Sequence, residues 1–278
     1  MEAISISDKT LYVSDLDGTL LRGNETTSAY TDSVINSLVE QGMHFSYATA
    51  RSFATASKVA KGIRAKVPLI VYNGALIIDN HTQEIILSHF FDAHEVAEIR
   101  EALQKSQIEP IVYSFINGVE KFSYLPNTAS QEMQVFLDSR KGDFRDHPLM
   151  DAAELFAGKV FYFACIDAAE KLFPVYQCLQ STHHCIYQKE FYSGNQWLEI
   201  LPLQASKANA ILQLKKHLNC NRVIAFGDGK NDISMFQISD ECYAVENAVD
   251  ELKEIATGII PSNDQDGVAK WLEAHTGR

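Results

Sequence analysis

Several features that mark particular classes of protein are missing from this sequence of 278 residues. Its first residues, MEAISISDKT, lack the basic start and the apolar run of a signal peptide. No apolar stretch approaches the length of roughly 18 residues that a membrane-spanning helix needs. The five cysteines form no CxxC pair, and their odd number cannot close completely into disulfides. These absences predict a soluble protein of the reducing cytoplasm.

Positive charge is also scarce, because 24 Lys and Arg residues face 36 Asp and Glu residues and give a formal net charge of -12. Nucleic acids and anionic membranes are therefore not expected as partners, since both need clustered basic residues. An anionic substrate would require a site that concentrates positive charge locally, from a metal ion, a few basic side chains or helix N-termini. The histidines show no HExxH spacing, and the His183-His184 pair is more typical of a solvated helix end than of a zinc site.

The first part of the chain predicts strands that alternate with helices. Residues 10–16 form a short apolar run that leads into a polar loop, and residues 44–49 and 69–78 are rich in β-formers. Between them, residues 30–41 and 53–61 have helical patterns. This alternation predicts βαβ units with a parallel sheet, whose ligands bind at the carboxyl ends of the strands.

The middle of the chain, residues 84–188, has its own set of helical and strand patterns, and no low-complexity linker separates it from its surroundings. The last third returns to the opening style, with an apolar strand at 222–226 followed by a polar loop. We therefore predict an α/β protein with a Rossmann-like parallel-sheet core, formed by residues 1–83 and 189–278, and a smaller inserted α/β domain at 84–188.

The segment DLDGTL at 15–20 follows the first predicted strand. Residues two apart in an extended chain point the same way, so Asp15 and Asp17 could face one pocket, where one carboxylate attacks and the other moves protons. The alternative is an ordinary turn, because Asp and Gly are both favoured in turns. The hexapeptide alone does not decide between these interpretations.

A second acidic loop, GDGKND at 227–232, also follows a short buried strand. Four carboxylates gathered at two strand ends would repel one another, and a hard divalent cation such as Mg²⁺ relieves that repulsion. Asn231 or Asp232 could equally cap the helix that follows, and both roles are compatible.

Taken together, these segments resemble the haloacid dehalogenase superfamily, specifically the Cof-type phosphatases with an inserted α/β cap of the type IIB kind. The resemblance spans nearly the whole chain. The family's four motifs are matched in order by DLDGTL, by Thr49 in YATARS, by Lys207 in ASKANAI and by GDGKND. NGA at 73–75 and DGV at 266–268 resemble secondary signatures of the same subgroup.

This resemblance implies a role for each acidic residue. Asp15 would be the nucleophile that forms an aspartyl-phosphate, and Asp17 the general acid and base. Mg²⁺ would be held by the Asp15 carboxylate, the main-chain carbonyl of Asp17 and the Asp228 carboxylate. Asp232 would act on the metal through a water molecule, or would lie next to the ligands without binding the metal directly.

The same resemblance implies that Thr49, Lys207 and Asn231 bind phosphate and that Arg51 and Asn73 line the site. Without the motifs around them, Thr49 would be an ordinary strand end and Lys207 a solvated lysine. One departure from the family pattern is Ala50, which stands where the family often has Gly after the motif Thr. Ala has less backbone freedom than Gly, which affects the fine placement of Thr49.

The function that follows is hydrolysis of a small phosphorylated metabolite, such as a sugar phosphate, a nucleotide or a cofactor phosphate. Two alternatives remain open, a sugar phosphomutase of the same superfamily and a non-catalytic phosphate-binding regulator. P-type pumps are excluded because they carry DKTGT and membrane spans, and dehalogenation has no use for Asp17 or a metal. The physiological substrate and the oligomeric state have no readable signature.

Overall fold

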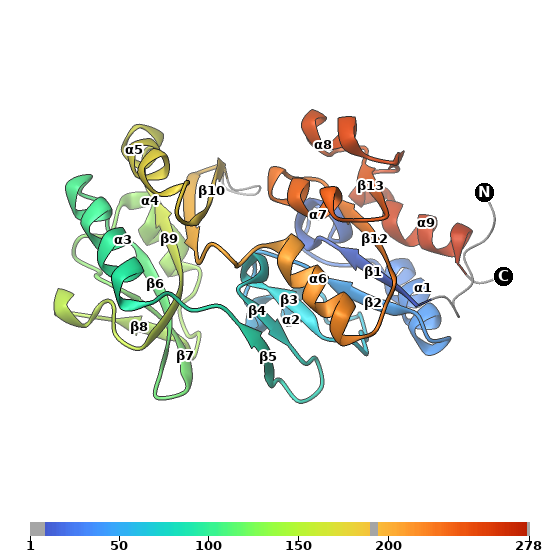
Figure 1. Cartoon of the computed structure of the whole chain (residues 1–278), viewed down its shortest axis with the longest axis horizontal. Coiled ribbons are helices and arrows are strands. Elements are labelled where there is room, and N and C mark those ends of the chain that lie inside the picture. Colours follow the sequence, from blue (N-terminus) through green and yellow to red (C-terminus); the bar gives the residue numbers. More distant parts are fainter. Residues whose placement is uncertain (1–8, 190–193, 277–278) are drawn as a thin grey trace. The chain divides into compact units, whose positions relative to one another are not determined.

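A computed structural model describes residues 9–189 and 194–276 of the chain. These residues separate into two compact units, which are considered one at a time (Figure 1). The first unit, here called the core unit, combines residues up to Ser88 with those from Ser206 onward. The second, the inserted unit, comprises His89–Ala205. No helix within the described ranges is both long and apolar enough to cross a membrane.

The core unit is built on a five-stranded parallel sheet with the order β14-β13-β12-β1-β2 (Figure 1). Its strands are β1 (Thr10–Ser14), β2 (His44–Tyr47), β12 (Arg222–Gly227), β13 (Glu241–Val245) and β14 (Gly258–Ile260). All five residues of β1 are buried, as expected of a central parallel strand covered on both faces. The α/β class with a parallel-sheet core is confirmed. Because β1 and β12 are parallel neighbours, their carboxyl ends, followed by Asp15 and Asp228, lie side by side.

Helices connect and cover these strands. They are α1 (Ala29–Glu40), α2 (Phe53–Val59), α6 (Lys207–His217), α7 (Ile233–Gln237), α8 (Asp250–Ile255) and α9 (Gly267–His275). Ser28, Ser52 and Ser206 cap α1, α2 and α6, and each side chain accepts a hydrogen bond from a backbone N–H of the first turn. In the core unit α1 packs against α9, and α6 packs against α7.

The β-rich segment at 69–78 folds as a hairpin and not as one strand. β3 (Leu69–Val71), β4 (Leu76–Ile78) and β5 (Ile85–Ser88) form a small antiparallel sheet. The reversal occurs at the short helical turn η2 (Tyr72–Gly74), where all three residues have positive φ. Gly74 could carry no side chain here, because a Cβ would lie 2.2 Å from the Ser206 carbonyl oxygen. The start of α6 is thereby held against η2.

The inserted unit contains a six-stranded sheet with the order β10-β11-β9-β6-β7-β8. Its strands are β6 (Ile111–Ile116), β7 (Val119–Tyr124), β8 (Asp146–Pro148), β9 (Lys159–Ile166), β10 (His184–Lys189) and β11 (Gln196–Leu201). Its helices are α3 (Ala93–Lys105), α4 (Gln131–Asp138) and α5 (Ala169–Leu179), with a short turn η3 (Ala152–Glu154). This unit begins later than the predicted 84–188 because β5 pairs with β4 of the core unit, and it ends later because β11 pairs with β9 and β10.

Candidate active site

Asp15 directly follows β1, at the carboxyl edge of the core sheet. Its backbone N–H donates to the Phe226 carbonyl oxygen at 2.9 Å and so continues the pairing of β1 with β12. The chain then turns sharply through η1 (Leu16–Leu20), where Gly18 has a φ of +77°. A Cβ on Gly18 would lie 2.4 Å from an Asp228 carboxylate oxygen. Only glycine lets this turn pass so close to the second acidic loop.

Lys207 is the first residue of α6, and its side chain is almost completely buried at 1% exposure. Its Nζ donates to Asp15 Oδ1 at 2.5 Å and to Asp232 Oδ1 at 2.7 Å. Burial alone would lower the pKa of Lys207, but the two carboxylates raise it above its ordinary value. The lysine therefore stays charged and joins two acidic residues that are far apart in the sequence.

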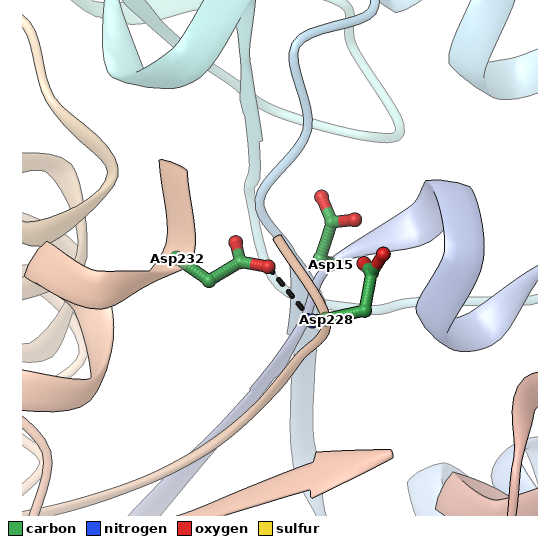
Figure 2. A group of neighbouring side chains, drawn as sticks. All are labelled: Asp15, Asp228 and Asp232. Carbon is green, nitrogen blue, oxygen red and sulfur yellow. Dashed lines mark hydrogen bonds between the residues drawn. The ribbon is translucent and has the colours of Figure 1, made fainter. Parts of the chain in front are cut away.

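The carboxylates of Asp15, Asp228 and Asp232 form one buried cluster (Figure 2). Each offers an oxygen, and these oxygens all lie within 4.8 Å of one another. Asp232 Oδ2 accepts from the backbone N–H groups of Asp228 and Gly229 at 3.0 Å each, which fixes the loop. Asp228 Oδ1 accepts from the Thr19 hydroxyl at 2.7 Å. The two acidic loops are thus joined to each other through side chains.

The electrostatics of this cluster are those of crowded negative charge. Burial raises the pKa of Asp15 well above its ordinary range, Lys207 opposes that shift, and the neighbouring carboxylates add to it. Burial also raises the pKa of Asp228 to about 7, with repulsion from Asp232 adding to the effect. Shifts of this kind, caused by burial together with like charge, concentrate at functional sites.

Asp17 is bound by a different partner from Asp15. The Arg51 guanidinium donates to both of its carboxylate oxygens, through Nε at 3.1 and 2.8 Å and through Nη2 at 2.6 Å. The same Nη2 also donates to Glu25 Oε2 at 2.8 Å. Arg51 is thus the contact that ties Asp17 to the segment following β2.

Thr49, Asn73 and Asn231 are connected to one another around the same edge of the sheet. The Thr49 hydroxyl accepts from the Arg51 backbone N–H at 3.1 Å, and the Thr49 carbonyl accepts from the Asn73 N–H at 2.8 Å. Asn231 Nδ2 donates to Asn73 Oδ1 at 3.3 Å. Thr49 and Asn73 are buried, so their polar groups are held in fixed directions.

The chain from residue 12 to residue 272 matches the family model of the haloacid dehalogenase-like hydrolases. It belongs to that family. It is similar over 95% of its length to a haloacid dehalogenase-like hydrolase of known structure from Bacteroides thetaiotaomicron, with 25% identity, 98% of that chain covered and a TM-score of 0.78.

Several curated relatives of this family member are named as phosphatases. It is 26% identical to the 5-amino-6-(5-phospho-D-ribitylamino)uracil phosphatase YwtE of Bacillus subtilis, over 93% of this chain and 95% of that protein. It is 29% identical to a putative phosphatase of Buchnera aphidicola subsp. Schizaphis graminum, over 94% of each. The chain is a phosphatase of the haloacid dehalogenase superfamily.

In this phosphatase the predicted site residues form two connected groups within the core unit. Lys207 joins Asp15 to Asp232, with Asp228 beside them. The other group contains Asp17 with Arg51, and Thr49 with Asn73 and Asn231, which are joined by hydrogen bonds. That Asp15 and Asp17 face one pocket stays a prediction; their carboxylates have separate basic partners, Lys207 and Arg51.

Three further residues support this site and were not singled out from the sequence. Thr19 lies inside the DLDGTL segment and holds Asp228. Asn247 donates from Nδ2 to the Gly18 carbonyl oxygen at 2.7 Å and so supports the turn that follows Asp15. Glu25 binds Arg51. Thr19 could have been found from its place in the motif, but a lone Asn or Glu in a loop carries no sequence signal.

The acidic cluster fits a hard divalent cation. Asp15, Asp228 and Asp232 supply only oxygen donors, and Mg²⁺ prefers carboxylate oxygens and water to nitrogen or sulfur. Burial and the neighbouring carboxylates raise the pKa values of Asp15 and Asp228, so their charged forms are disfavoured unless a further positive charge is present. A cation that neutralises the cluster is therefore compatible with the residues that are present.

Proposed function

We propose that this phosphatase is a Mg²⁺-dependent phosphomonoester hydrolase that acts on a small phosphorylated metabolite through an aspartyl-phosphate on Asp15. The observation that carries the proposal is the buried Asp15 carboxylate, which lies within 2.5 Å of the Lys207 ammonium and beside two further carboxylates. A carboxylate buried next to a fixed cation is oriented for attack, and the cation stabilises the charge that develops on the phosphoryl group.

In the proposed reaction an Asp15 carboxylate oxygen attacks phosphorus while the bond from phosphorus to the ester oxygen breaks. Asp17 donates a proton to the departing oxygen and then removes a proton from the water that hydrolyses the aspartyl-phosphate. The phosphoryl oxygens are bound by Lys207, the Thr49 hydroxyl and the Asn231 amide. Arg51 and Asn73 line the site and hold Thr49 and Asn231 in place. These residues act by orientation and by fixed charge, as is usual in phosphoryl transfer.

Mg²⁺ would be held by the carboxylates of Asp15 and Asp228 and by the Asp17 main-chain carbonyl, with Asp232 acting behind them. When bound, the ion would supply positive charge that shields the attacking carboxylate from the anionic phosphoryl group. The clustering of three buried carboxylates supports this assignment.

The substrate class is proposed from the chemistry of the site and from the relatives. The Bacillus subtilis relative is named as a phosphatase for a phosphorylated ribitylamino-uracil. A primary phosphate ester on a small, neutral, hydroxyl-rich chain is therefore the substrate type to test first, beside sugar phosphates, nucleotides and cofactor phosphates. Release of free phosphate from such a panel would also separate a hydrolase from a phosphomutase, which would return an isomerised sugar phosphate instead.

Substitution of Asp15 tests the nucleophile. Asp15→Asn keeps the size of the side chain but removes the attacking charge, so hydrolysis of 4-nitrophenyl phosphate should fall by at least about 10³-fold. Rapid acid quenching with ³²P-labelled substrate should trap label on the wild-type protein and none on the variant. Turnover by Asp15→Asn at the wild-type rate would reject the assignment.

Removal of divalent cations tests the metal. Dialysis against EDTA should abolish phosphate release, and added Mg²⁺ should restore it, because three buried carboxylates would otherwise repel an anionic ester. Full activity in the presence of chelator would rule out the proposed role of the ion.

A further inference from the structure

Glu25 is an acidic residue that belongs to none of the family-like motifs, yet its side chain reaches into the candidate site. Its Oε2 accepts from Arg51 Nη2 at 2.8 Å, and the same nitrogen donates to Asp17 Oδ1 at 2.6 Å. Arg51 and Asp17 are largely buried, with exposed side-chain fractions of 14% and 23%. One guanidinium nitrogen thus joins the two carboxylates.

The main chain and the guanidinium of Arg51 are held by different residues of the core unit. Its backbone N–H donates to the Thr49 hydroxyl at 3.1 Å, and its carbonyl accepts from the Tyr72 N–H at 3.0 Å. These bonds fix the main chain but leave a long side chain with several rotatable bonds. The orientation of the guanidinium therefore depends on the carboxylates at its far end, Asp17 and Glu25.

Glu25 is itself held by a tight turn. Its backbone N–H donates to the Arg22 carbonyl at 2.9 Å, and the Arg22 N–H donates to the Thr26 carbonyl at 3.0 Å. Glu25 adopts a φ of +58°, an uncommon conformation for a residue other than glycine. Arg22 is anchored in turn by Asp266, with a contact of 2.6 Å between Nη2 and Oδ2. A rigid turn thus presents the Glu25 carboxylate to Arg51.

We infer that Glu25 is a positioning residue, which acts through Arg51 to hold the Asp17 carboxyl group in the direction needed for proton transfer to the leaving group. The inference rests on the proposed function, because it needs Asp17 as the acid. Without Glu25 the guanidinium loses a carboxylate partner, and Asp17 then spreads over more orientations. Proton transfer suffers from such a loss of alignment even where the residue that carries the proton is unchanged.

The choice of leaving group separates this role from a general effect on the fold. 4-Nitrophenolate is a stable anion that leaves without much help from an acid, whereas phenolate leaves far better when it is protonated. The two aryl phosphates have nearly the same shape, so binding affects both alike. Misalignment of Asp17 should therefore slow phenyl phosphate more than 4-nitrophenyl phosphate, but a partly unfolded enzyme would slow both equally.

The test compares Glu25→Gln with the wild type on these two substrates at saturating Mg²⁺. We expect kcat/KM to fall about tenfold for phenyl phosphate and less than about threefold for 4-nitrophenyl phosphate, as for a partial loss of acid catalysis. Glu40→Gln is the matched control, because Glu40 forms an exposed ion pair with Lys66 in the same unit. It should change neither rate constant.

A double-mutant cycle with Asp17→Asn decides whether Glu25 acts through Asp17. In the Asp17→Asn background, Glu25→Gln should cause no further loss on phenyl phosphate, because the group that it positions is gone. Equal losses on both substrates, or fully additive losses in the double variant, would overturn the inference while leaving the proposed function intact. A wild-type enzyme that hydrolyses neither ester and traps no phosphate on Asp15 would overturn both.

Discussion

The core unit and the inserted unit both bury charged side chains, but they do so in different ways. In the core unit three carboxylates lie around the single ammonium of Lys207, and the pKa values of Asp15 and Asp228 are raised. In the inserted unit the guanidinium of Arg145 donates to Glu120 at 2.8 Å and to Asp143 at 2.6 Å through separate nitrogens. The first arrangement has three carboxylates for one cation, and the second has two carboxylates that both pair directly with one cation.

The two sheets explain where each cluster can form. In the parallel sheet of the core unit, β1 and β12 end at the same edge, so the residues that follow them meet. The sheet of the inserted unit is antiparallel except where β7 pairs with β8, so neighbouring strands mostly end at opposite edges. Its buried interior is instead rich in aromatic contacts, such as those of Phe91 and Phe156 with Phe163. We therefore expect the catalytic residues in the core unit, whereas the inserted unit has a packed aromatic interior.

The largest expected effect comes from the cation of the core cluster. Lys207→Met keeps much of the buried volume but leaves Asp15 and Asp232 without their shared donor. Hydrolysis of 4-nitrophenyl phosphate should fall by about 10³-fold, since a buried, fixed charge next to the phosphoryl group is lost. Steady-state kinetics at saturating Mg²⁺ would measure this fall in kcat.

Lys215 provides the control for this substitution, because it lies on the same helix and its Nζ is 3.6 Å from a carboxylate oxygen of the half-exposed Asp240. Lys215→Met should leave the rate within about twofold of the wild type, as for other weak surface ion pairs. If Lys207→Met hydrolysed 4-nitrophenyl phosphate as fast as Lys215→Met, the buried cation of the core unit would have no role in the reaction.

The ion-pair network of the inserted unit should affect stability more than the chemical step. Arg145 is 2% exposed, and Arg145→Met would remove the guanidinium that pairs with the largely buried carboxylates of Glu120 and Asp143. Breaking a buried pair in this way costs about 3 kcal/mol of unfolding free energy. Trp197 is in the inserted unit and Trp271 is in the core unit, and the chain has only these two tryptophans. Fluorescence of a Trp271→Phe background would therefore follow unfolding of the inserted unit alone.

Lys141→Met is the matched control, because Lys141 pairs with Asp138 from an exposed position in the same unit. It should shift the urea midpoint of the Trp197 signal very little. A comparable shift for Lys141→Met and Arg145→Met would mean that the Arg145 network contributes no more than a surface pair.

The fold and the charged cluster were predictable to the extent that they depend on local patterns. The short apolar runs before Asp15 and Asp228 predict buried strands, and the parallel pairing of β1 with β12 then brings both residues to one edge. The 69–78 segment shows where this reasoning stops. Its composition is that of a strand, but positive φ at Tyr72, Asn73 and Gly74 turns it into a hairpin, and the contact of Gly74 with Ser206 that favours this turn is long-range.

The partners of individual side chains were harder to predict for a similar reason. Arg51 lies two residues after Thr49, which suggests a place near the site but not a partner. Its bidentate contact with Asp17 depends on how the turn after β1 approaches the turn after β2. Glu25 was not predicted at all, because its position depends on the tight turn at 22–26 and on the Arg22 contact with Asp266. Such contacts are set by tertiary packing and leave no periodicity in the sequence.

The smallest expected effect concerns Asp266, which supports the core site from outside the charged cluster. Its carboxylate accepts from Arg22 through two nitrogens, at 3.1 and 2.6 Å, and from the Thr31 hydroxyl at 3.1 Å. Burial would raise the pKa of Asp266, but these donors, Arg22 above all, lower it below its ordinary value of 3.8. Asp266→Asn should therefore lower the melting temperature at pH 7 by about 2 °C, the shift that corresponds to a loss of about 1 kcal/mol.

The pH dependence of that difference has a defined sign. A carboxylate whose pKa is lower in the folded state stabilises the fold fully above the unfolded value of 3.8, and this contribution disappears as the pH falls through the lower, folded value. The difference in melting temperature between wild type and Asp266→Asn should thus be constant from pH 7 to pH 5 and should shrink below about pH 4. Asp250→Asn, which changes a carboxylate that is 94% exposed, should show almost no difference at any of these values. A difference that grew on acidification would mean that Asp266 is held in its protonated form, contrary to its contacts with Arg22.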